Sequence, residues 1–444
     1  MHANRKRVAV IGAGISGLGA AWSLREAAEV TVFEASDRIG GHAWTVDIDH
    51  PNGPVSADIG FICFNEPNYP NFTALLEHLR VATVPTNMSF SVSDPYGYEW
   101  SSDLTGVFAW KRNLLDRRFH GLLREILRFN DLARAQIRAQ QTPEGSLGEW
   151  LDQRGFSGLL RDAYLLPMGA AIWSTPERDM LDYPADNLLT FFNNHRLMHA
   201  LRPIWRTVRG GSRNHVAALS AAIGPERLRT GARIRLIRPS PDGGVTLCFD
   251  EGPKERFDAV ILACHADEAR AMLDPAYDEQ RLALGSIRFS RNEIVVHRDP
   301  SLMPRRRSAW ASWNVLRSDR SDRVCVSYWM NRLQGLPQGA DVFVTLNAVR
   351  EPDPALTFGT YVFEHPMYDM ASIAARRAVQ RVQGRNGLFF SGAWLGDGFH
   401  EAGLRTGLEA AHALGGSVPW TAHLEHQHTF RATPDATLAR ASAR

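Results

Sequence analysis

A short run of glycines near the start of the chain most constrains how it can fold. In RVAVIGAGISGLGAAWSL, a strand-like pattern leads into Gly12, Gly14 and Gly17 and then into a helix-forming run. The first glycine permits a tight turn, the second lets a pyrophosphate approach the backbone, and the third lets helix and strand pack closely. Free N–H groups at the start of the helix, around Ile15 and Ser16, attract phosphate oxygens.

A second strand follows and ends in an acidic residue. EVTVFEAS places Glu34 and Ala35 about twenty residues beyond the glycines, where a carboxylate binds the adenosine ribose of a dinucleotide. Strand, glycine turn, helix, strand and acid in this order predict a dinucleotide site in an α/β domain. The alternative is a glycine-rich helix that packs without a ligand.

The residues after this acid favour FAD over NAD. SDRIGGHAWT carries Arg38, Gly40, Gly41 and His42. This extension resembles that of the glutathione-reductase-like flavoproteins, especially the amine oxidase and protoporphyrinogen oxidase superfamily. The resemblance implies an FAD-binding Rossmann domain with an interleaved α+β substrate domain. Arg38 and the glycine pair would lie along the pyrophosphate and ribityl chain; His42 would face the isoalloxazine or be satisfied within its loop.

Other segments match the same superfamily. Asp58, Ile59 and Gly60 resemble its next flavin-facing loop, and the residue matching Ile234 lies near the adenine. The resemblance divides the chain into segments. The FAD-binding parts are 1–75, 205–275 and 385–415, the substrate parts are 76–204 and 276–384, and the tail is 416–444.

The stretch SGAWLGDGFHEAGLRTG resembles the superfamily's C-terminal flavin motif. Gly392 and Ala393 would then approach the ribityl chain, and Phe399 would form an aromatic wall beside the ring. The helix that begins near His400 and Glu401 would aim its N-terminus at the flavin N1–C2=O edge, where negative charge develops on reduction.

Two departures from the superfamily argue against the usual amine chemistry. Trp394 stands where amine oxidases commonly carry an acidic residue. Those enzymes also commonly hold a lysine that binds a water near flavin N5. This chain has only Lys6, Lys111 and Lys254, and none is well placed in the sequence for that role.

LLPMGAAIWS, YPADNLLTFFNNH and GAWLGDGFHEAG together resemble a bacterial subfamily of NAD/FAD-binding oxidoreductases. One branch desaturates methylated acyl chains of phospholipids on the way to furan fatty acids. The resemblance implies dehydrogenation of a lipid or another apolar small molecule, with a hydride passing to flavin N5 and a proton to a base. The alternatives are a flavin oxidase of an amine, porphyrinogen or polyene, and a non-redox flavoprotein.

Candidate residues for this chemistry come from two parts of the chain. The residues predicted to move the proton are His400, Glu401 and His195. Those predicted to line the substrate pocket are Trp173, Tyr183, Phe191, Asn194 and Phe399, although core packing explains most of these aromatics equally well.

The stretch FAWKRNLLDRRFHGLLREILRFNDLARAQIRAQ predicts a basic amphipathic helix, with apolar residues from Leu114 to Phe129 at helical spacing. Such a helix lies in an anionic lipid interface or buries its stripe against its own lobe. The net charge of +2 gives no general attraction for nucleic acid. No uninterrupted apolar stretch reaches the roughly 18 residues of a membrane span.

Cysteine and histidine spacing indicates no metal site. The four cysteines form no CxxC pair, and the tail histidines His423, His426 and His428 lie in a polar, irregular context. A reducing cytoplasm fits, with the inner face of the cell membrane as a working surface. The oligomeric state stays open, a homodimer among the alternatives.

Overall fold

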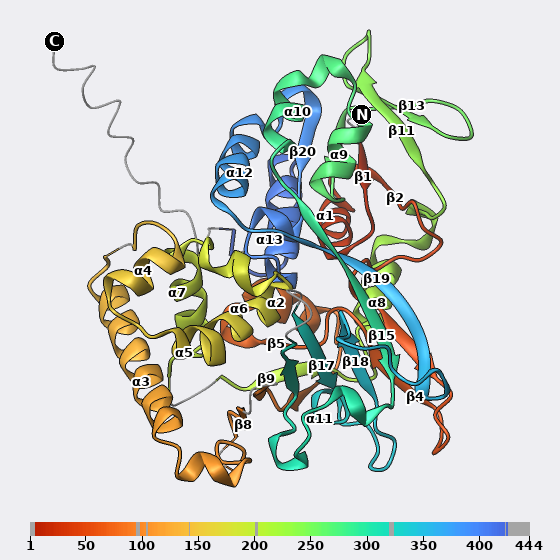
Figure 1. Ribbon diagram of the computed structural model, residues 1–444. Helices are drawn as coiled ribbons and strands as arrows, with labels where there is room; N and C mark the ends of the chain where they lie inside the picture. Colours follow the sequence, from red (N-terminus) through yellow and green to blue (C-terminus); the bar gives the residue numbers. More distant parts are fainter. Residues whose placement is uncertain are drawn as a thin grey trace, which may run out of the picture.

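The computed structural model describes residues 5–94, 98–103, 105–141, 143–199, 203–318, 324–421 and 423–424. A parallel sheet surrounded by helices forms the upper part of the molecule in Figure 1, and a larger sheet flanked by a helical lobe forms the lower part. His426, His428 and most of the 416–444 tail lie outside the described residues.

The parallel sheet has the order β10-β2-β1-β14-β20. Its strands are β1 Arg7–Ile11, β2 Glu29–Phe33, β10 Leu228–Arg229, β14 Ala259–Leu262 and β20 Leu388–Phe390. Neighbouring strands pair in parallel throughout. Helix α1 (Ile15–Leu24) connects β1 to β2, and α13 (His400–Ala413) follows β20. The predicted α/β fold with a Rossmann-type unit is confirmed.

Helices α1 and α13 pack so closely that their backbones are almost in contact. A Cβ built at Gly407 would lie 2.2 Å from the carbonyl oxygen of Ser16, and one at Gly403 would lie 2.9 Å from Cγ2 of Ile15. The hydroxyl of Ser16 donates to the carbonyl oxygen of Gly403 at 2.7 Å. Small residues on α13 therefore let the two helix N-termini lie side by side.

The larger sheet has the order β19-β15-β18-β17-β16-β7-β8. Its strands are β7 Phe90–Ser93, β8 Glu99–Ser101, β15 Phe289–His297, β16 Trp313–Leu316, β17 Cys325–Trp329, β18 Phe343–Leu346 and β19 Thr357–Pro366. Only β16 and β7 pair in parallel among these described strands. Segments far apart in sequence thus share one sheet.

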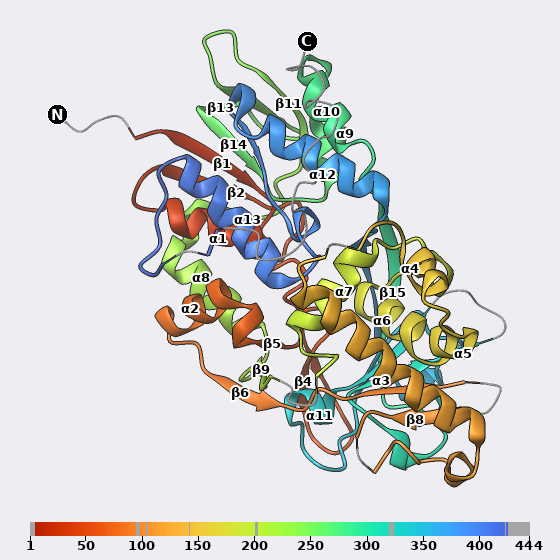
Figure 2. The ribbon, with the colours of Figure 1, turned by 90° about the vertical axis from the view of Figure 1, so that its left-hand side faces the viewer.

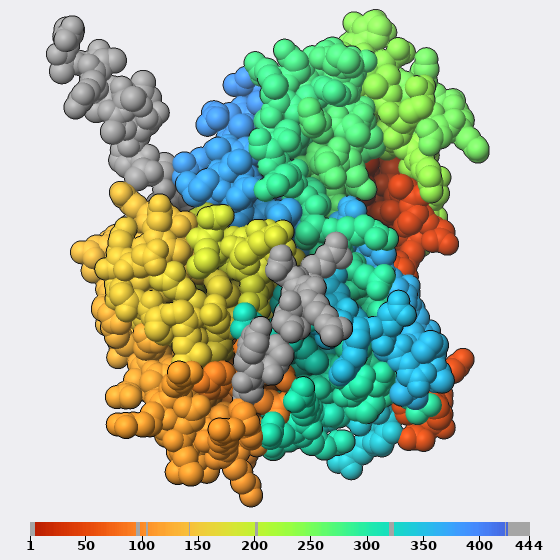
Figure 3. Space-filling view, in the orientation of Figure 1, coloured from red at the N-terminus to blue at the C-terminus, as the bar shows by residue number. Residues whose placement is uncertain are grey.

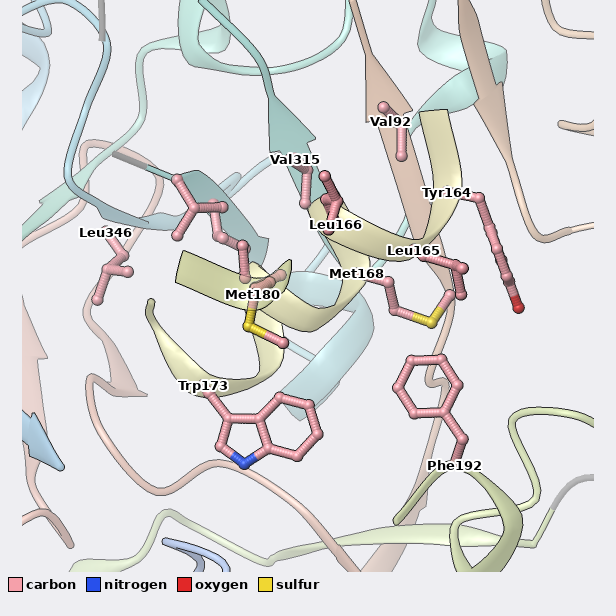
Figure 4. Close-up of a cluster of buried hydrophobic side chains, with 14 of the residues drawn as sticks. Val92, Tyr164, Leu165, Leu166, Met168, Trp173, Met180, Phe192, Val315 and Leu346 are labelled. Atoms are coloured by element: carbon pink, nitrogen blue, oxygen red, sulfur yellow. The ribbon is translucent and has the colours of Figure 1, made fainter. Parts of the chain in front are cut away.

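A helical lobe covers one side of this sheet, as the turned view in Figure 2 also shows. Its helices are α3 Arg117–Arg138, α4 Leu147–Gln153, α5 Gly158–Leu160, α6 Leu166–Trp173 and α7 Ala185–Asn194. Figure 4 shows the interface, where Leu165 and Met168 lie near Val92 and Val315 of the sheet. Trp173, Tyr183 and Phe191 of this core also line the cavity of the candidate site.

The remaining elements connect these layers. The smaller sheets contain β3 Thr45–Ile48 with β4 Val55–Asp58, β5 Phe64–Asn65 with β9 Trp205–Val208 and β6 Thr83–Thr86, and β11 Ile234–Pro239 with β12 Val245–Phe249 and β13 Glu255–Phe257. The other helices are α2 Pro70–His78, α8 Arg213–Ile223, α9 Ala266–Met272, α10 Asp278–Leu284, α11 Met330–Gln334 and α12 Met370–Val382. Strands β11 and β12 pair in antiparallel fashion as a hairpin.

The basic helix predicted from Phe108 onward begins only at Arg117. A 3₁₀ turn over Lys111–Leu114 precedes α3, whose apolar face buries Phe119, Leu122 and Phe129 in the lobe. Of the two alternatives given for this helix, the structure shows the one in which the apolar stripe is buried against its own lobe. Of the helices in the described ranges, none combines the length and apolar composition needed to cross a bilayer.

Two glycine substitutions test the helix crossing. Gly407→Ala places a methyl group against backbone and should lower the free energy of unfolding by about 3 kcal/mol. Gly121→Ala on α3, where a Cβ meets no atom within 4 Å, should raise it by about 0.5–1 kcal/mol. Urea denaturation measures both, and equal effects would contradict the close approach.

Candidate functional site

The carboxyl ends of the parallel strands β1, β2, β14 and β20 lie at one edge of the sheet, where sheets of this kind bind ligands in a crevice. Gly12 has φ of 102°, and a Cβ there would lie 2.7 Å from the carbonyl oxygen of Ala263. A Cβ at Gly17 would lie 1.9 Å from the Gly12 carbonyl oxygen, whereas one at Gly14 meets no described atom within 4 Å. The turn is therefore tightly packed at Gly12 and Gly17, whereas the space beside Cα of Gly14 is open.

Glu34 lies at the mouth of this turn. Its carboxylate accepts hydrogen bonds from the backbone N–H groups of Ala13 (2.9 Å) and Ser36 (3.0 Å). Ala35, next to it, is exposed. Ile234 begins β11 close by, because the N–H of Ala232 donates to the Glu34 carbonyl oxygen. This arrangement suits the predicted adenosine end of a dinucleotide.

Arg38 shapes the second glycine loop. Its guanidinium donates to the carbonyl oxygens of Ile39 (3.2 Å) and Gly41 (2.8 Å) and lies 3.9 Å from the ring centroid of Trp44. The predicted contact of Arg38 with pyrophosphate stays a prediction, and the observed bonds give it a role in holding the loop.

The two glycine loops touch each other at the crevice. Gly40 and Gly41 both have positive φ, and a Cβ at Gly41 would lie 3.1 Å from Cα of Gly14. A Cβ at Gly60 would lie 2.2 Å from the carbonyl oxygen of His42, and Ile59 is buried beside it. Bare backbone from three predicted segments therefore meets at one place.

Asp58 has a structural position. Its carboxylate accepts from the hydroxyl of Thr45, the N–H and hydroxyl of Ser212, and the side-chain amide of Gln334. Burial raises the pKa of Asp58 to about 6. These bonds join β3, β4, the start of α8 and the end of α11. They leave Asp58 engaged with protein groups, and its predicted contact with flavin stays a prediction.

The N-terminus of α13 offers unpaired backbone donors. The helix begins with a bond from the N–H of Gly403 to the carbonyl oxygen of Phe399, so the N–H groups of His400, Glu401 and Ala402 have no partner inside the helix. Just before it, the N–H of Gly392 donates to the hydroxyl of Thr406 at 3.0 Å.

The loop before α13 is tied to β14 through a tryptophan. Ala393 opens a 3₁₀ turn whose Trp394 is buried and donates from Nε1 to the carbonyl oxygen of Cys264 at 3.1 Å. Trp394 therefore ties the loop before α13 to the segment that follows β14.

The ring of His400 points away from the aromatic cavity described below. It stacks on Phe61 with centroids 3.8 Å apart, and its Nε2 lies 3.3 Å from Nε2 of His215. Burial holds the pKa of His400 well below its usual range. The ring is thus part of the packing between α13, α2 and α8, while the backbone of His400 belongs to the helix N-terminus.

Glu401 binds the start of another helix. Its carboxylate accepts from the N–H of Asn71 (3.0 Å), the side-chain amide of Asn71 (2.7 Å) and the N–H of Phe72 (2.9 Å). These donors belong to the first turn of α2, which needs such acceptors. The contacts favour a structural role, and proton transfer by Glu401 stays a prediction.

The predicted pocket residues come together in one small cavity. It is lined by Trp173, Tyr183, Asn187, Phe191, Asn194, His195, Tyr368, Gly396 and Asp397. Its free volume is about 10 Å³, room for about one water. Phe399 stacks on Phe191 at 5.1 Å, and the ring of His195 stacks on Phe191 at 3.9 Å. The cavity is an aromatic enclosure between α7 and the loop before α13.

A buried arginine backs this enclosure. The guanidinium of Arg376 lies 3.9 Å from the ring centroid of Tyr368, and the side chain is 1% exposed. Its Nε and Nη2 have no hydrogen-bond partner among the described residues. Burial raises the pKa of Asp397, although Arg405 and Arg376 oppose this. Neither Arg376 nor Tyr368 was predicted from sequence, because no local motif marks α12 as a neighbour of the cavity.

A second group of side chains lies on the other side of the glycine loops. His42 stacks on Phe363 at 4.6 Å, with His365 at 5.4 Å and His265 at 6.3 Å. His365 Nδ1 lies 3.0 Å from the amide nitrogen of the buried Asn292. Burial lowers the pKa of His42 to about 3 and that of His365 to about 4, so both are neutral near pH 7. Only the pairing of β15 with β19 brings Asn292 to His365, so sequence alone did not reveal it.

The residues around the crevice fit a flavin dinucleotide. Open backbone at Gly14 and unpaired N–H groups at the start of α13 can receive phosphate and the ring's oxygen edge. Nε2 of His42 and the hydroxyl of Ser391 are buried without a partner among the described residues. All three lysines are exposed, so none lies in the cavity or the crevice.

Comparisons with known proteins agree with this geometry. Residues 15–295 match the family described as flavin containing amine oxidoreductase. Tryptophan 2-monooxygenase of Pantoea agglomerans pv. gypsophilae is 42% identical over 87 residues, which are 19% of this chain and 15% of that protein. The flavin-containing monoamine oxidase AofH, so named in Mycobacterium tuberculosis, is 25% identical over 290 residues, 60% of this chain. The chain spans 15% and 59% of the lengths of these two relatives.

Solved structures show the same fold. Cyclohexylamine oxidase from Brevibacterium oxydans has a TM-score of 0.67 at 17% identity, covering 92% of this chain and 98% of its own. The CLA-producing fatty acid isomerase from P. acnes has a TM-score of 0.62 at 15% identity, covering 94% of this chain and 99% of its own. These likenesses concern the fold alone.

The pH dependence of stability tests the position of Glu401. Burial raises its pKa to about 7, against about 4.3 in an unfolded chain. The folded state therefore holds the proton more tightly, and ionisation should lower the free energy of unfolding as pH rises between these values, by about 3 kcal/mol at most. Glu401→Gln cannot ionise and should lack this decrease in urea denaturation across that range. Parallel pH profiles for variant and wild type would contradict the buried position.

Proposed function

The chain belongs to the flavin containing amine oxidoreductase family and its cofactor is FAD; on this premise we propose that it dehydrogenates an unsaturated fatty acyl chain. The substrate we propose is a methylated acyl group of a membrane phospholipid, as in furan fatty acid synthesis. The observation that carries the proposal is an aromatic cavity backed by the buried guanidinium of Arg376, whose Nε and Nη2 have no hydrogen-bond partner among the described residues.

The charges near the cavity disfavour an amine substrate. A protonated amine entering beside Tyr368 would approach the guanidinium of Arg376, whose charge is poorly screened in a buried setting. Burial raises the pKa of the Asp397 carboxyl, which lines the same cavity. With every lysine exposed, the water-binding lysine common in amine oxidases has no equivalent near the cavity. An apolar chain avoids these costs.

Each part of the enclosure has a role in the proposed reaction. FAD supplies the acceptor for the hydride. Trp173, Tyr183 and Phe191 would contact the chain and exclude water; because the cavity holds only about 10 Å³, these side chains must move apart for the chain to enter. The N-terminus of α13 stabilises negative charge that develops nearby. As hydride and proton leave neighbouring carbons, the remaining electron pair forms the C=C bond.

Of the predicted proton acceptors, His195 suits the role best. Its ring lines the cavity, and its Nδ1 lies 3.1 Å from the carbonyl oxygen of Phe191, which orients the ring. The ring of His400 packs on Phe61 instead, and the carboxylate of Glu401 binds α2. His195 would take the proton from the carbon next to the one that loses hydride.

The fatty acid isomerase of similar fold offers a precedent for an acyl chain in this architecture. The UDP-galactopyranose mutase of similar fold, at 16% identity and a TM-score of 0.67, is a precedent for the non-redox alternative. Net reduction of the bound flavin by a substrate distinguishes the proposed dehydrogenation from a non-redox function.

Anaerobic reduction of the yellow holoprotein tests the proposal. Vesicles containing a methyl-branched, monounsaturated acyl phospholipid should bleach the flavin, whereas the saturated phospholipid, cyclohexylamine and protoporphyrinogen should not. Bleaching by cyclohexylamine, or by protoporphyrinogen, without bleaching by any acyl lipid would overturn the proposal.

A variant at His195 tests the proton transfer separately. His195→Asn should slow bleaching by the acyl lipid by about 10²–10⁴-fold and flatten its dependence on pH, because the proton acceptor is lost. Phe399→Tyr keeps the aromatic wall and serves as the control. If His195→Asn bleaches as fast as Phe399→Tyr, another group accepts the proton.

A further inference from the structure

The end of the helical lobe that precedes α3 exposes apolar and cationic side chains together. Leu114 is 50% exposed and Leu115 is 89% exposed, and Lys111 and Arg112 beside them are exposed as well. This segment projects at the lower end of the molecule in Figure 1, and Figure 3 shows its side chains at the surface. Other leucines, such as Leu282, are exposed as well, so the distinguishing feature here is two adjacent exposed leucines beside exposed cations.

A second basic segment lies against the first. The buried carboxylate of Glu99 on β8 accepts from the N–H of Arg305 (2.7 Å) and from Nη1 of Arg306 (2.6 Å). The side-chain amide of Asn113, in the turn before α3, donates to the carbonyl oxygen of Glu99 (3.4 Å). Arg306 also lies 4.9 Å from the ring centroid of Trp110. Residues 305–307 therefore adjoin residues 110–115.

We name this surface the basic tip. It consists of Trp110, Lys111, Arg112, Leu114, Leu115, Arg117, Arg118, Arg305, Arg306 and Arg307. Its cations come from two segments almost two hundred residues apart in sequence, so the fold is needed to assemble it.

The acidic groups around the basic tip neutralise only part of its charge. Glu99 is buried and paired with Arg306, and Asp103 pairs with Arg332 at 2.8 Å. Asp116 caps α3 by accepting from the N–H of Arg118. Asp341 lies 3.7 Å from Arg307. Lys111, Arg112 and Arg117 have no ion pair among the described residues, so the surface keeps a positive charge.

We propose that the basic tip docks on an anionic lipid bilayer. Leu114 and Leu115 would enter the interface, Trp110 would lie at headgroup depth, and the surrounding cations would contact lipid phosphates. A nucleic acid would use the cations and leave both leucines in water, so the exposed leucines favour a bilayer. Contact is made by a turn and a loop, and the apolar face of α3 stays in the lobe core.

This docking is independent of the chemistry at the cavity. It would hold the enzyme where acyl lipids are abundant, yet it predicts binding to lipids that are not substrates. If the protein does not dehydrogenate acyl lipids, the docking proposal is unaffected. If it does not bind vesicles, the proposed reaction is unaffected.

Vesicle sedimentation of the full-length holoprotein tests the proposal. Binding should be strong to vesicles of phosphatidylcholine mixed with phosphatidylglycerol, and weak to phosphatidylcholine alone. Leu115→Glu should weaken binding to the mixed vesicles at least about tenfold. Leu282→Glu is the matched control, since Leu282 is 79% exposed on α10 at the opposite end of the molecule, and it should bind like wild type.

A double variant tests the charge contribution. Arg117→Ala with Arg118→Ala should weaken binding roughly fivefold for each cation removed and reduce its dependence on salt. The exposed positions let each variant fold, which thermal unfolding checks. Equal binding by Leu115→Glu and Leu282→Glu would overturn the proposal, as would binding to duplex DNA without binding to mixed vesicles.

Discussion

The close crossing of α1 and α13 is the contact on which the site depends. Gly403 and Gly407 bring the backbone of α13 against Ile15 and Ser16, and the Ser16 hydroxyl fixes the distance. Because the contact between Gly403 and Ile15 lies near both helix N-termini, it brings two sets of unpaired N–H groups close together. Such groups can receive phosphate oxygens or the oxygen edge of a flavin ring. Residues separated by almost the whole chain thus form a single cofactor site.

The groups beside this crevice divide into two kinds. Asp58 and Glu401 are buried carboxylates whose bonds to several segments hold the framework together. The cavity side chains instead form an aromatic enclosure that also contains Asn187, Asn194 and Asp397. Behind it lies the buried guanidinium of Arg376, whose Nε and Nη2 have no hydrogen-bond partner among the described residues. Burial strengthens the interaction of that charge with the nearby groups of the cavity.

Sequence reasoning succeeded where local backbone geometry carries the signal. The glycine turns and the α/β fold follow from the spacing of glycines and apolar residues along the sequence. It could not predict that the backbone and the ring of His400 have different roles. The ring packs on Phe61 and His215, which come from distant parts of the sequence. Sequence reasoning also missed Asn292, His365, Tyr368 and Arg376, which reach the site through strand pairing and helix packing. The burial of the α3 face depended likewise on the sheet beneath the lobe.

The central claim is that an acyl chain loses a hydride and a proton in the enclosure backed by Arg376. Mass spectrometry of the lipid after a single anaerobic turnover tests it most directly. The account predicts a product with one additional C=C bond, formed in equal amount to the flavin reduced. Reduced flavin with unchanged lipid, or an imine formed from an amine under the same conditions, would contradict it.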